Sequence, residues 1–259
     1  MSYGLKLLVI FVITVPAALL IIVLGPFDRN GKYVHKITCL WTKLILTVGG
    51  IALNVKSQSP IDPKQQYVFI ANHRSNIDIP VLIQSLSALR LRWIAKRELI
   101  WVPFFGWAMW AAKHITVNRS DRFDALGSLK RAKEAMKDGV SLVVFPEGTR
   151  GDEGDFLPFK RGGFLLAAKT GTPIVPVTIN GSAAILPKGD WRIRDGQIDV
   201  VIGTPVSVES YRPGTLRALS AHVRELMWKN LQTASQVETP KQGDSQPARV
   251  SVPLEKEPV

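Results

Sequence analysis

Short apolar runs alternate with segments of helical periodicity along most of the chain, and this alternation limits the folds that it can adopt. The apolar runs are rich in Val and Ile, as expected of buried strands. They lie at residues 67–72, 91–96, 114–119, 140–145, 173–179 and 198–206. Amphipathic helical segments lie between several of them. The pattern predicts an α/β fold with a largely parallel sheet flanked by helices.

The N-terminal part has a different character. Residues 7–27 contain no charged side chain and are long enough to cross a bilayer as a helix. A second apolar stretch at 37–53 is interrupted by Lys43 and two glycines, which favours a helix lying at the membrane interface. We therefore predict that residues 1–56 form a membrane-anchoring helical pair that precedes the α/β domain.

A cleaved signal peptide is the alternative interpretation of this first segment. Only Lys6 precedes it as a basic residue, and no A-x-A-type cleavage site follows, so the composition argues against processing. Arg29, Lys32 and Lys36 follow the segment, and such an excess of basic residues favours a cytoplasmic location for the rest of the chain.

Charge and composition distinguish a folded domain and a tail in the rest of the chain. The chain has 33 Lys and Arg against 21 Asp and Glu, a net charge of +12. A body this basic is expected to meet an anionic partner such as a lipid headgroup, a phosphorylated substrate or nucleic acid. Residues 57–232 are predicted to form the folded domain. Residues 233–259 hold four prolines and no aromatic side chain, which predicts a disordered tail.

The segment "NHRSNID" places His73 directly after an apolar run and Asp78 five positions later, at the start of a helical segment. A carboxylate on one imidazole nitrogen fixes the tautomer and stabilises the imidazolium that forms when the other nitrogen takes a proton. This pattern is typical of a general base. A histidine in a helix-capping turn, with Asp78 serving only as the cap, explains the same spacing.

A second apolar run leads directly into "FPEGTR". Gly148 permits close approach of the backbone to a ligand, Thr149 offers a hydroxyl, and the planar guanidinium of Arg150 suits a phosphate. By itself, this segment is more typical of an ordinary strand-to-loop turn with a solvated arginine.

Together, the two segments resemble the glycerolipid acyltransferase family, in particular the bacterial-type 1-acyl-sn-glycerol-3-phosphate acyltransferases. His73 and Asp78 match the family's His-x4-Asp motif, and residues 145–150 match its Phe-Pro-Glu-Gly-Thr-Arg motif. The resemblance extends over roughly residues 60–230. It includes Arg119 in "HITVNR", although the preceding Asn118 departs from the usual charged residue, and Lys96 in "IAKREL".

The resemblance implies transfer of an acyl group from acyl-CoA or acyl-carrier protein to the sn-2 hydroxyl of lysophosphatidate, which gives phosphatidate. His73 would be the base and Asp78 its orienting partner. Arg150, with Arg119 and Lys96, would hold the phosphate. No metal or cofactor is expected, because a thioester is already activated. Glu147 is expected to hold Arg150 or the loop backbone, since its charge would repel a phosphate.

Membrane lipids are expected as partners, at the cytoplasmic face of the inner membrane. A lyso-ornithine lipid or another lysophospholipid remains an alternative acceptor within the same family. A non-catalytic protein that binds anionic lipids is a more distant alternative, because such a protein has no use for a base. The chain has no helix-turn-helix, finger or RNP-like pattern, so nucleic acid is not an expected partner.

Overall fold

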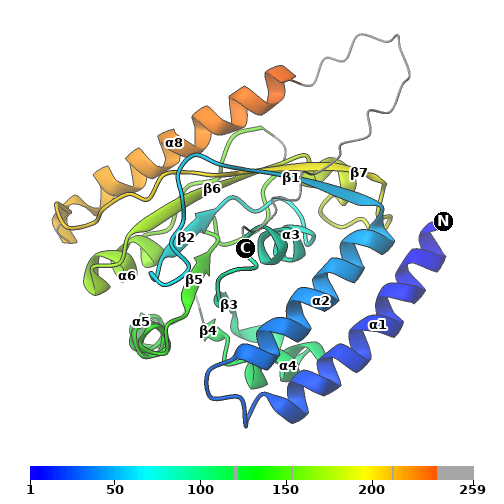
Figure 1. Cartoon of the computed structure of the whole chain (residues 1–259). Coiled ribbons are helices and arrows are strands. Elements are labelled where there is room, and N and C mark those ends of the chain that lie inside the picture. Colours follow the sequence, from blue (N-terminus) through cyan, green and yellow to red (C-terminus); the bar gives the residue numbers. More distant parts are fainter. Residues whose placement is uncertain (119–121, 153, 212, 238–259) are drawn as a thin grey trace, which may run out of the picture.

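The computed structural model describes residues 1–118, 122–152, 154–211 and 213–237, and within them seven strands form one sheet in the order β1-β7-β6-β2-β5-β3-β4 (Figure 1). Neighbouring strands are parallel except β6 and β7. The predicted α/β class with a largely parallel sheet is therefore confirmed. The strands are β1 Ile51–Ser57, β2 Val68–Ala71, β3 Leu91–Lys96, β4 Ile115–Val117, β5 Ser141–Val144, β6 Ile174–Asn180 and β7 Gly196–Ile202.

Helices cover both faces of this sheet (Figure 1). On one face, α2 and α3 contribute Leu46 and Leu82 to a core with Phe69 of β2. On the other face, α5, α6 and α8 form a second core around Val68 and Ile70. The helical segments are α1 Tyr3–Leu24, α2 Lys32–Gly49, α3 Asp78–Ser85, η1 Arg97–Trp101, α4 Phe105–Ala111, α5 Arg122–Lys137, α6 Gly162–Thr170, α7 Ser182–Ile185, η2 Pro213–Thr215 and α8 Leu216–Val237.

The central strand β2 explains why the run before His73 is apolar throughout. It lies between β5 and β6, and each of its four residues is fully buried. Successive side chains of a strand point to opposite faces, so a strand covered by helices on both sides has no position for an exposed polar residue. The segment that contains His73 begins where this strand ends.

The sheet starts earlier than the sequence predicts. Residues 51–57 form β1, which pairs in parallel with β7, so the predicted boundary at residue 56 falls inside a strand. Gly50 is responsible: it adopts φ +70°, and its N–H donates to carbonyls of the last turn of α2, which ends the helix there. The sequence reading treated the glycines only as interruptions of an apolar helix.

The C-terminal boundary also differs. Helix α8 continues to Val237, five residues into the segment predicted to be disordered. The rest of that segment, residues 238–259, lies outside the described residues.

Of the described helices, α1 is the one that is long and apolar enough to cross a membrane by length and composition. One side of it packs on α2 and α4, and the other side exposes large apolar side chains. These are Leu5, Leu8, Phe11, Val12, Leu19, Leu20, Val23 and Leu24.

Both ends of α1 are attached to the α/β body. Near its start, the buried ammonium of Lys6 donates to the carbonyls of Gly49 (2.8 Å) and Ile193 (3.1 Å) and to the carboxylate of Asp195. Just past its other end, a Cβ atom on Gly25 would lie 2.6 Å from the carbonyl oxygen of Ala111 in α4. The helix therefore lies along the body and does not project from it.

The Lys6 contacts lead to a stability prediction. We expect Lys6→Met to lower the free energy of unfolding by about 1–3 kcal/mol, because two carbonyls at the α1 contact lose their donor. Thermal unfolding in detergent, with the exposed Lys43→Met as control, measures this effect. Hydrogen bonding from Lys6 lowers the pKa of Asp195, so the ion pair contributes above the ordinary aspartate pKa and is lost as the pH falls below it. Equal stability of the Lys6 variant and wild type would contradict the assignment.

Candidate active site

The two motif segments meet because their strands are neighbours. Strands β2 and β5 pair in parallel, with Val68 opposite Leu142 and Ile70 opposite Val144. The carboxyl ends of neighbouring parallel strands lie at the same edge of a sheet, where α/β proteins bind their ligands. The backbone N–H of Gly151 donates to the carbonyl of His73 at 2.9 Å, which joins the two segments directly.

His73 and Asp78 form a hydrogen-bonded pair. His73 Nδ1 lies 2.9 Å from Asp78 Oδ2, and the same oxygen accepts from the backbone N–H groups of Arg74 (2.7 Å) and Ser75 (2.8 Å). Asp78 is fully buried, whereas the His73 side chain is 16% exposed. Because the carboxylate accepts at Nδ1, a neutral imidazole at this position carries its proton on Nδ1 and presents Nε2 as an acceptor.

Asp78 therefore does more than begin a helix. It is the first residue of α3, and its side chain folds back over the preceding turn to reach the imidazole. The geometry matches the arrangement expected of a base and its orienting carboxylate.

An aromatic ring fixes the plane of the imidazole. Phe145 stacks on His73, with ring centroids 4.0 Å apart and an angle of 10° between the planes. The buried Trp93 packs against Phe145 in turn, with ring centroids 5.7 Å apart. Sequence reasoning gave Phe145 no role of its own, although it is the first residue of the second motif. Trp93 itself belongs to the buried core.

Glu147 joins the loops through backbone groups. Its carboxylate is buried, with Oε1 accepting from His73 N and Oε2 from Leu157 N, both at 2.9 Å. The structure thus places it on the loop backbone, one of the two arrangements that we expected. Its charge is directed at N–H donors within the protein, which reduces its repulsion of an anionic ligand.

The remaining residues of the second motif form a tight turn at the same edge. Gly148 has φ +75°, and a Cβ atom there would lie 2.8 Å from Lys160 Nζ. Thr149 is exposed and Arg150 half-buried. Within the described part of the chain, no hydrogen bond or ion pair engages the Arg150 guanidinium. Lys160 is a cation that sequence reasoning missed, although the adjacent "KRGG" was a basic signal in the sequence.

Two predicted cations are not placed in this cluster. Lys96 ends β3 at the same edge, but its side chain is exposed and lies 3.4 Å from Glu98 Oε1. None of the described contacts joins it to His73 or Arg150. Arg119 lies outside the described residues. Among the described residues, no group of three or more His, Cys, Asp or Glu side chains is placed to hold a metal ion.

Comparison with known proteins gives the family. Residues 52–180 match the family model described as Acyltransferase. The chain is 32% identical to a 1-acyl-sn-glycerol-3-phosphate acyltransferase of Haemophilus influenzae over 234 residues, which cover 88% of this chain and 95% of that protein. The chain belongs to the 1-acyl-sn-glycerol-3-phosphate acyltransferase family. The resemblance drawn from the two motifs is therefore confirmed.

Other members of this acyltransferase family agree. The Escherichia coli 1-acyl-sn-glycerol-3-phosphate acyltransferase is 30% identical, over 83% of this chain and 89% of its own length. The human 1-acyl-sn-glycerol-3-phosphate acyltransferase alpha is 36% identical over 69% of this chain, which spans 63% of the human protein. The crystal structure of the Thermotoga maritima enzyme PlsC, a 1-acyl-sn-glycerophosphate acyltransferase, superposes with a TM-score of 0.70 at 26% identity. That match covers 91% of this chain and all of that one.

Proposed function

We propose that this acyltransferase moves an acyl group from acyl-CoA or acyl-carrier protein to the sn-2 hydroxyl of lysophosphatidate and so forms phosphatidate. The observation that carries the proposal is the His73–Asp78 pair, in which Asp78 accepts at Nδ1 and leaves Nε2 available beside the loop that bears Arg150. The names of the related proteins support the same acceptor.

In the proposed reaction, His73 Nε2 takes the proton of the acceptor hydroxyl as its oxygen attacks the thioester carbonyl. Asp78 stabilises the imidazolium that forms. The tetrahedral intermediate then collapses, the carbon–sulfur bond breaks, and the departing thiolate takes the proton from the imidazolium. The products are an ester and a free thiol. The sequence has no G-x-S-x-G elbow, so we propose direct transfer without an acyl-enzyme.

The acceptor headgroup is proposed to bind at the turn of the second motif. A phosphomonoester needs fixed hydrogen-bond donors, and Arg150 offers a guanidinium that no described residue engages. Lys160 supplies a second cation against Gly148, while Glu147 holds the loop in place. Thr149 offers a hydroxyl at the same turn, and Lys96 and Arg119 remain proposed contacts.

The N-terminal helices are proposed to hold the enzyme in one leaflet, at the cytoplasmic face of the inner membrane. A 22-residue helix is ~33 Å long, enough to cross a bilayer core. However, Lys6 at one end and Gly25 at the other both contact the body, so a full crossing would carry body residues to both membrane surfaces. An in-plane orientation instead lets the exposed apolar side meet lipid.

The experiment that tests the acceptor proposal measures acyl transfer to a panel of lysolipids. We expect turnover with lysophosphatidate to exceed that with lysophosphatidylcholine and lyso-ornithine lipid. We expect Arg150→Ala to raise KM for lysophosphatidate about tenfold or more, because a charge-assisted contact is lost, with a smaller change in kcat. The exposed Arg217→Ala in α8 is the control. A preference for an acceptor without a phosphomonoester, or an unchanged KM, would count against the proposal.

A further inference from the structure

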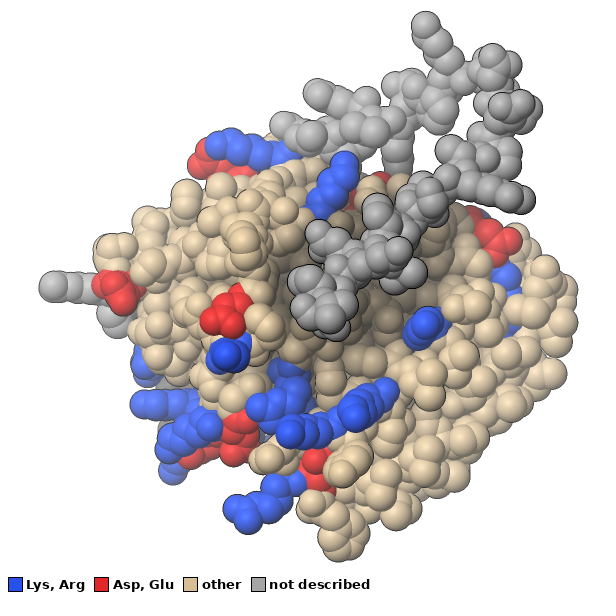
Figure 2. Space-filling view, viewed as in Figure 1, with Lys and Arg blue, Asp and Glu red and all other residues tan. Residues whose placement is uncertain are grey.

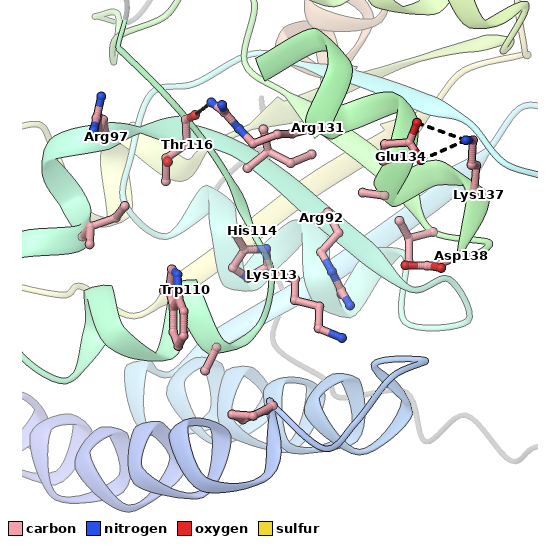
Figure 3. A pocket seen from close by; sticks show the side chains of 16 residues that line it. Arg92, Arg97, Trp110, Lys113, His114, Thr116, Arg131, Glu134, Lys137 and Asp138 are labelled. Carbon is pink, nitrogen blue, oxygen red and sulfur yellow. Dashed lines mark hydrogen bonds and ion pairs between the residues drawn. The ribbon is translucent and has the colours of Figure 1, made fainter. Parts of the chain in front are cut away.

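A large cavity lies away from the His73 loop, along the edge strand β4. Its volume is about 860 Å³, and it is bounded by α4, α5 and the turn after α1 (Figure 3). In Figure 2, Lys and Arg gather around α5 and β4, whereas the surface over α1 is nearly uncharged. Five cationic side chains line the cavity against two carboxylates: Arg92, Arg97, Lys113, Arg131 and Lys137, with Glu134 and Asp138.

Arg92 is the most informative of these cations. It is 5% exposed, and its guanidinium donates to the neighbouring carbonyl of Leu91 at 3.1 Å. It packs against Gly31, where a Cβ atom would overlap Nη2. The nearby carboxylate of Asp28 is occupied by the N–H groups of Lys32 (3.1 Å) and Val34 (2.9 Å). Burial lowers the pKa of Arg92, which shows the cost of keeping this charge away from water.

Buried charges in proteins are normally paired. Within the described residues, no carboxylate is hydrogen-bonded to Arg92, although the charges of Asp28 and Asp138 partly offset the lowering of its pKa, and its side chain lines the cavity near Lys113 (Figure 3). Lys113 reaches the same space, where its ammonium donates to the carbonyls of Asp28 (3.4 Å) and Arg29 (3.5 Å). Arg131 lines the opposite wall and donates to Thr116 O at 2.8 Å. The cavity therefore presents more cationic than acidic side chains, and this excess favours an anionic ligand.

A chain of contacts links the cavity lining to the proposed catalytic pair. His114 lines the cavity and accepts at Nδ1 from the backbone N–H of Trp93 (3.3 Å). The Trp93 ring packs on Phe145, which stacks on His73. Burial and the neighbouring Arg92 lower the pKa of His114 to about 3, so it adds no positive charge. Arg97 continues the cavity lining to the carboxyl end of β3.

We propose that this cavity binds the phosphate groups of a nucleotide-type acyl donor, namely the pyrophosphate and ribose phosphate of a coenzyme A thioester. Its flexible pantetheine arm would carry the acyl group from the cavity to His73. The inference rests on the proposed function, because it assigns a place to the donor of that reaction. Clustered Arg and Lys donors match multiple phosphate oxygens. An anionic lipid headgroup is the other source of the same chemistry.

The test compares three donors with the full-length enzyme in non-ionic detergent: oleoyl-CoA, oleoyl-3′-dephospho-CoA and oleoyl-pantetheine, which has no phosphate. We expect kcat/KM of the wild type to fall along this series by about tenfold or more in total. Arg92→Gln and Arg131→Gln should each lower kcat/KM for oleoyl-CoA about tenfold, mainly through KM, and leave oleoyl-pantetheine unchanged. The exposed Lys169→Gln in α6 is the matched control, and its kcat/KM values for the three donors should equal those of the wild type.

Several outcomes would overturn the inference. A wild type that does not distinguish the three donors would do so, as would variants that lose activity equally with all three. To distinguish a lipid headgroup from the acyl donor as the ligand, acyl transfer is also measured in phosphatidylcholine vesicles with and without phosphatidylglycerol. If the variants lose the response to phosphatidylglycerol but keep donor selectivity, the cavity is a headgroup site. If Arg92→Gln does not fold, Arg131→Gln and Lys113→Gln carry the same comparison.

A binding measurement separates this inference from the proposed function. If no donor acylates lysophosphatidate, the proposed function fails, and calorimetric titration with coenzyme A still examines the cavity. Binding by the wild type that weakens about tenfold in Arg131→Gln would then support the site. Absence of binding, or equal binding by wild type and variant, would remove it.

Discussion

Replacing His73 with alanine should lower kcat for acyl transfer to lysophosphatidate by roughly 10²–10⁴-fold, the usual contribution of a positioned general base. The acceptor hydroxyl would lose the imidazole nitrogen that takes its proton. We expect KM for lysophosphatidate to change little, since the phosphate contacts proposed for Arg150 would remain. Steady-state assays with a labelled acyl donor measure both constants.

The matched control for this variant is His222→Ala, which removes an exposed histidine of α8. It should retain wild-type kcat. If His73→Ala turned over lysophosphatidate at the wild-type rate, His73 would not be the base. The interpretation of the segment as a simple capping turn would then be favoured.

The second large effect is expected for Asp78→Asn, for which we predict a fall in kcat of ~10²–10⁴-fold. The amide is nearly the same size as the carboxylate, so the α3 turn should be retained. However, it has no charge to stabilise the imidazolium, and its neutral oxygen is a weaker acceptor for the three N–H groups that now donate to Asp78 Oδ2, namely those of His73 Nδ1, Arg74 N and Ser75 N.

Circular dichroism and thermal unfolding should show that the Asp78→Asn protein is folded, so that lost turnover is not lost structure. The exposed Asp62→Asn serves as control, because among the described residues its carboxylate accepts from the backbone N–H of Lys64 alone. A folded Asp78→Asn enzyme with wild-type kcat would show that the carboxylate has no part in the proton transfer.

The site depends on how the two loops are held. The Glu147 carboxylate accepts from the backbone N–H groups of His73 and Leu157, while the Phe145 ring stacks on the imidazole and fixes its plane. Three residues of the second motif thus have different surroundings: Phe145 and Glu147 contact His73, and Arg150 is left unengaged by described residues. This division explains how one short segment can serve both the hydroxyl and the headgroup of a proposed phosphorylated acceptor.

Local patterns in the sequence determined most strands, the family and the N-terminal helix of this protein. The apolar runs determined most strands, because a strand buried on both faces must be apolar at every position, as β2 is. The two motifs, each directly after an apolar run, determined the family. The uncharged N-terminal segment predicted an apolar helix, because 21 residues without a charge are rare in a water-exposed helix.

Only the tertiary structure decided the remaining features, because each depends on which distant residues meet. β1 was recognisable only through its pairing with β7, some 145 residues later. Lys6, which in the sequence is merely a charge before an apolar segment, is buried against Ile193 and Asp195. Likewise, the cavity around Arg92 brings together side chains from β3, α4, α5 and the α1–α2 turn. Neither hydrophobic periodicity nor a short motif encodes such contacts, since both report a residue's own neighbours in sequence and not its neighbours in space.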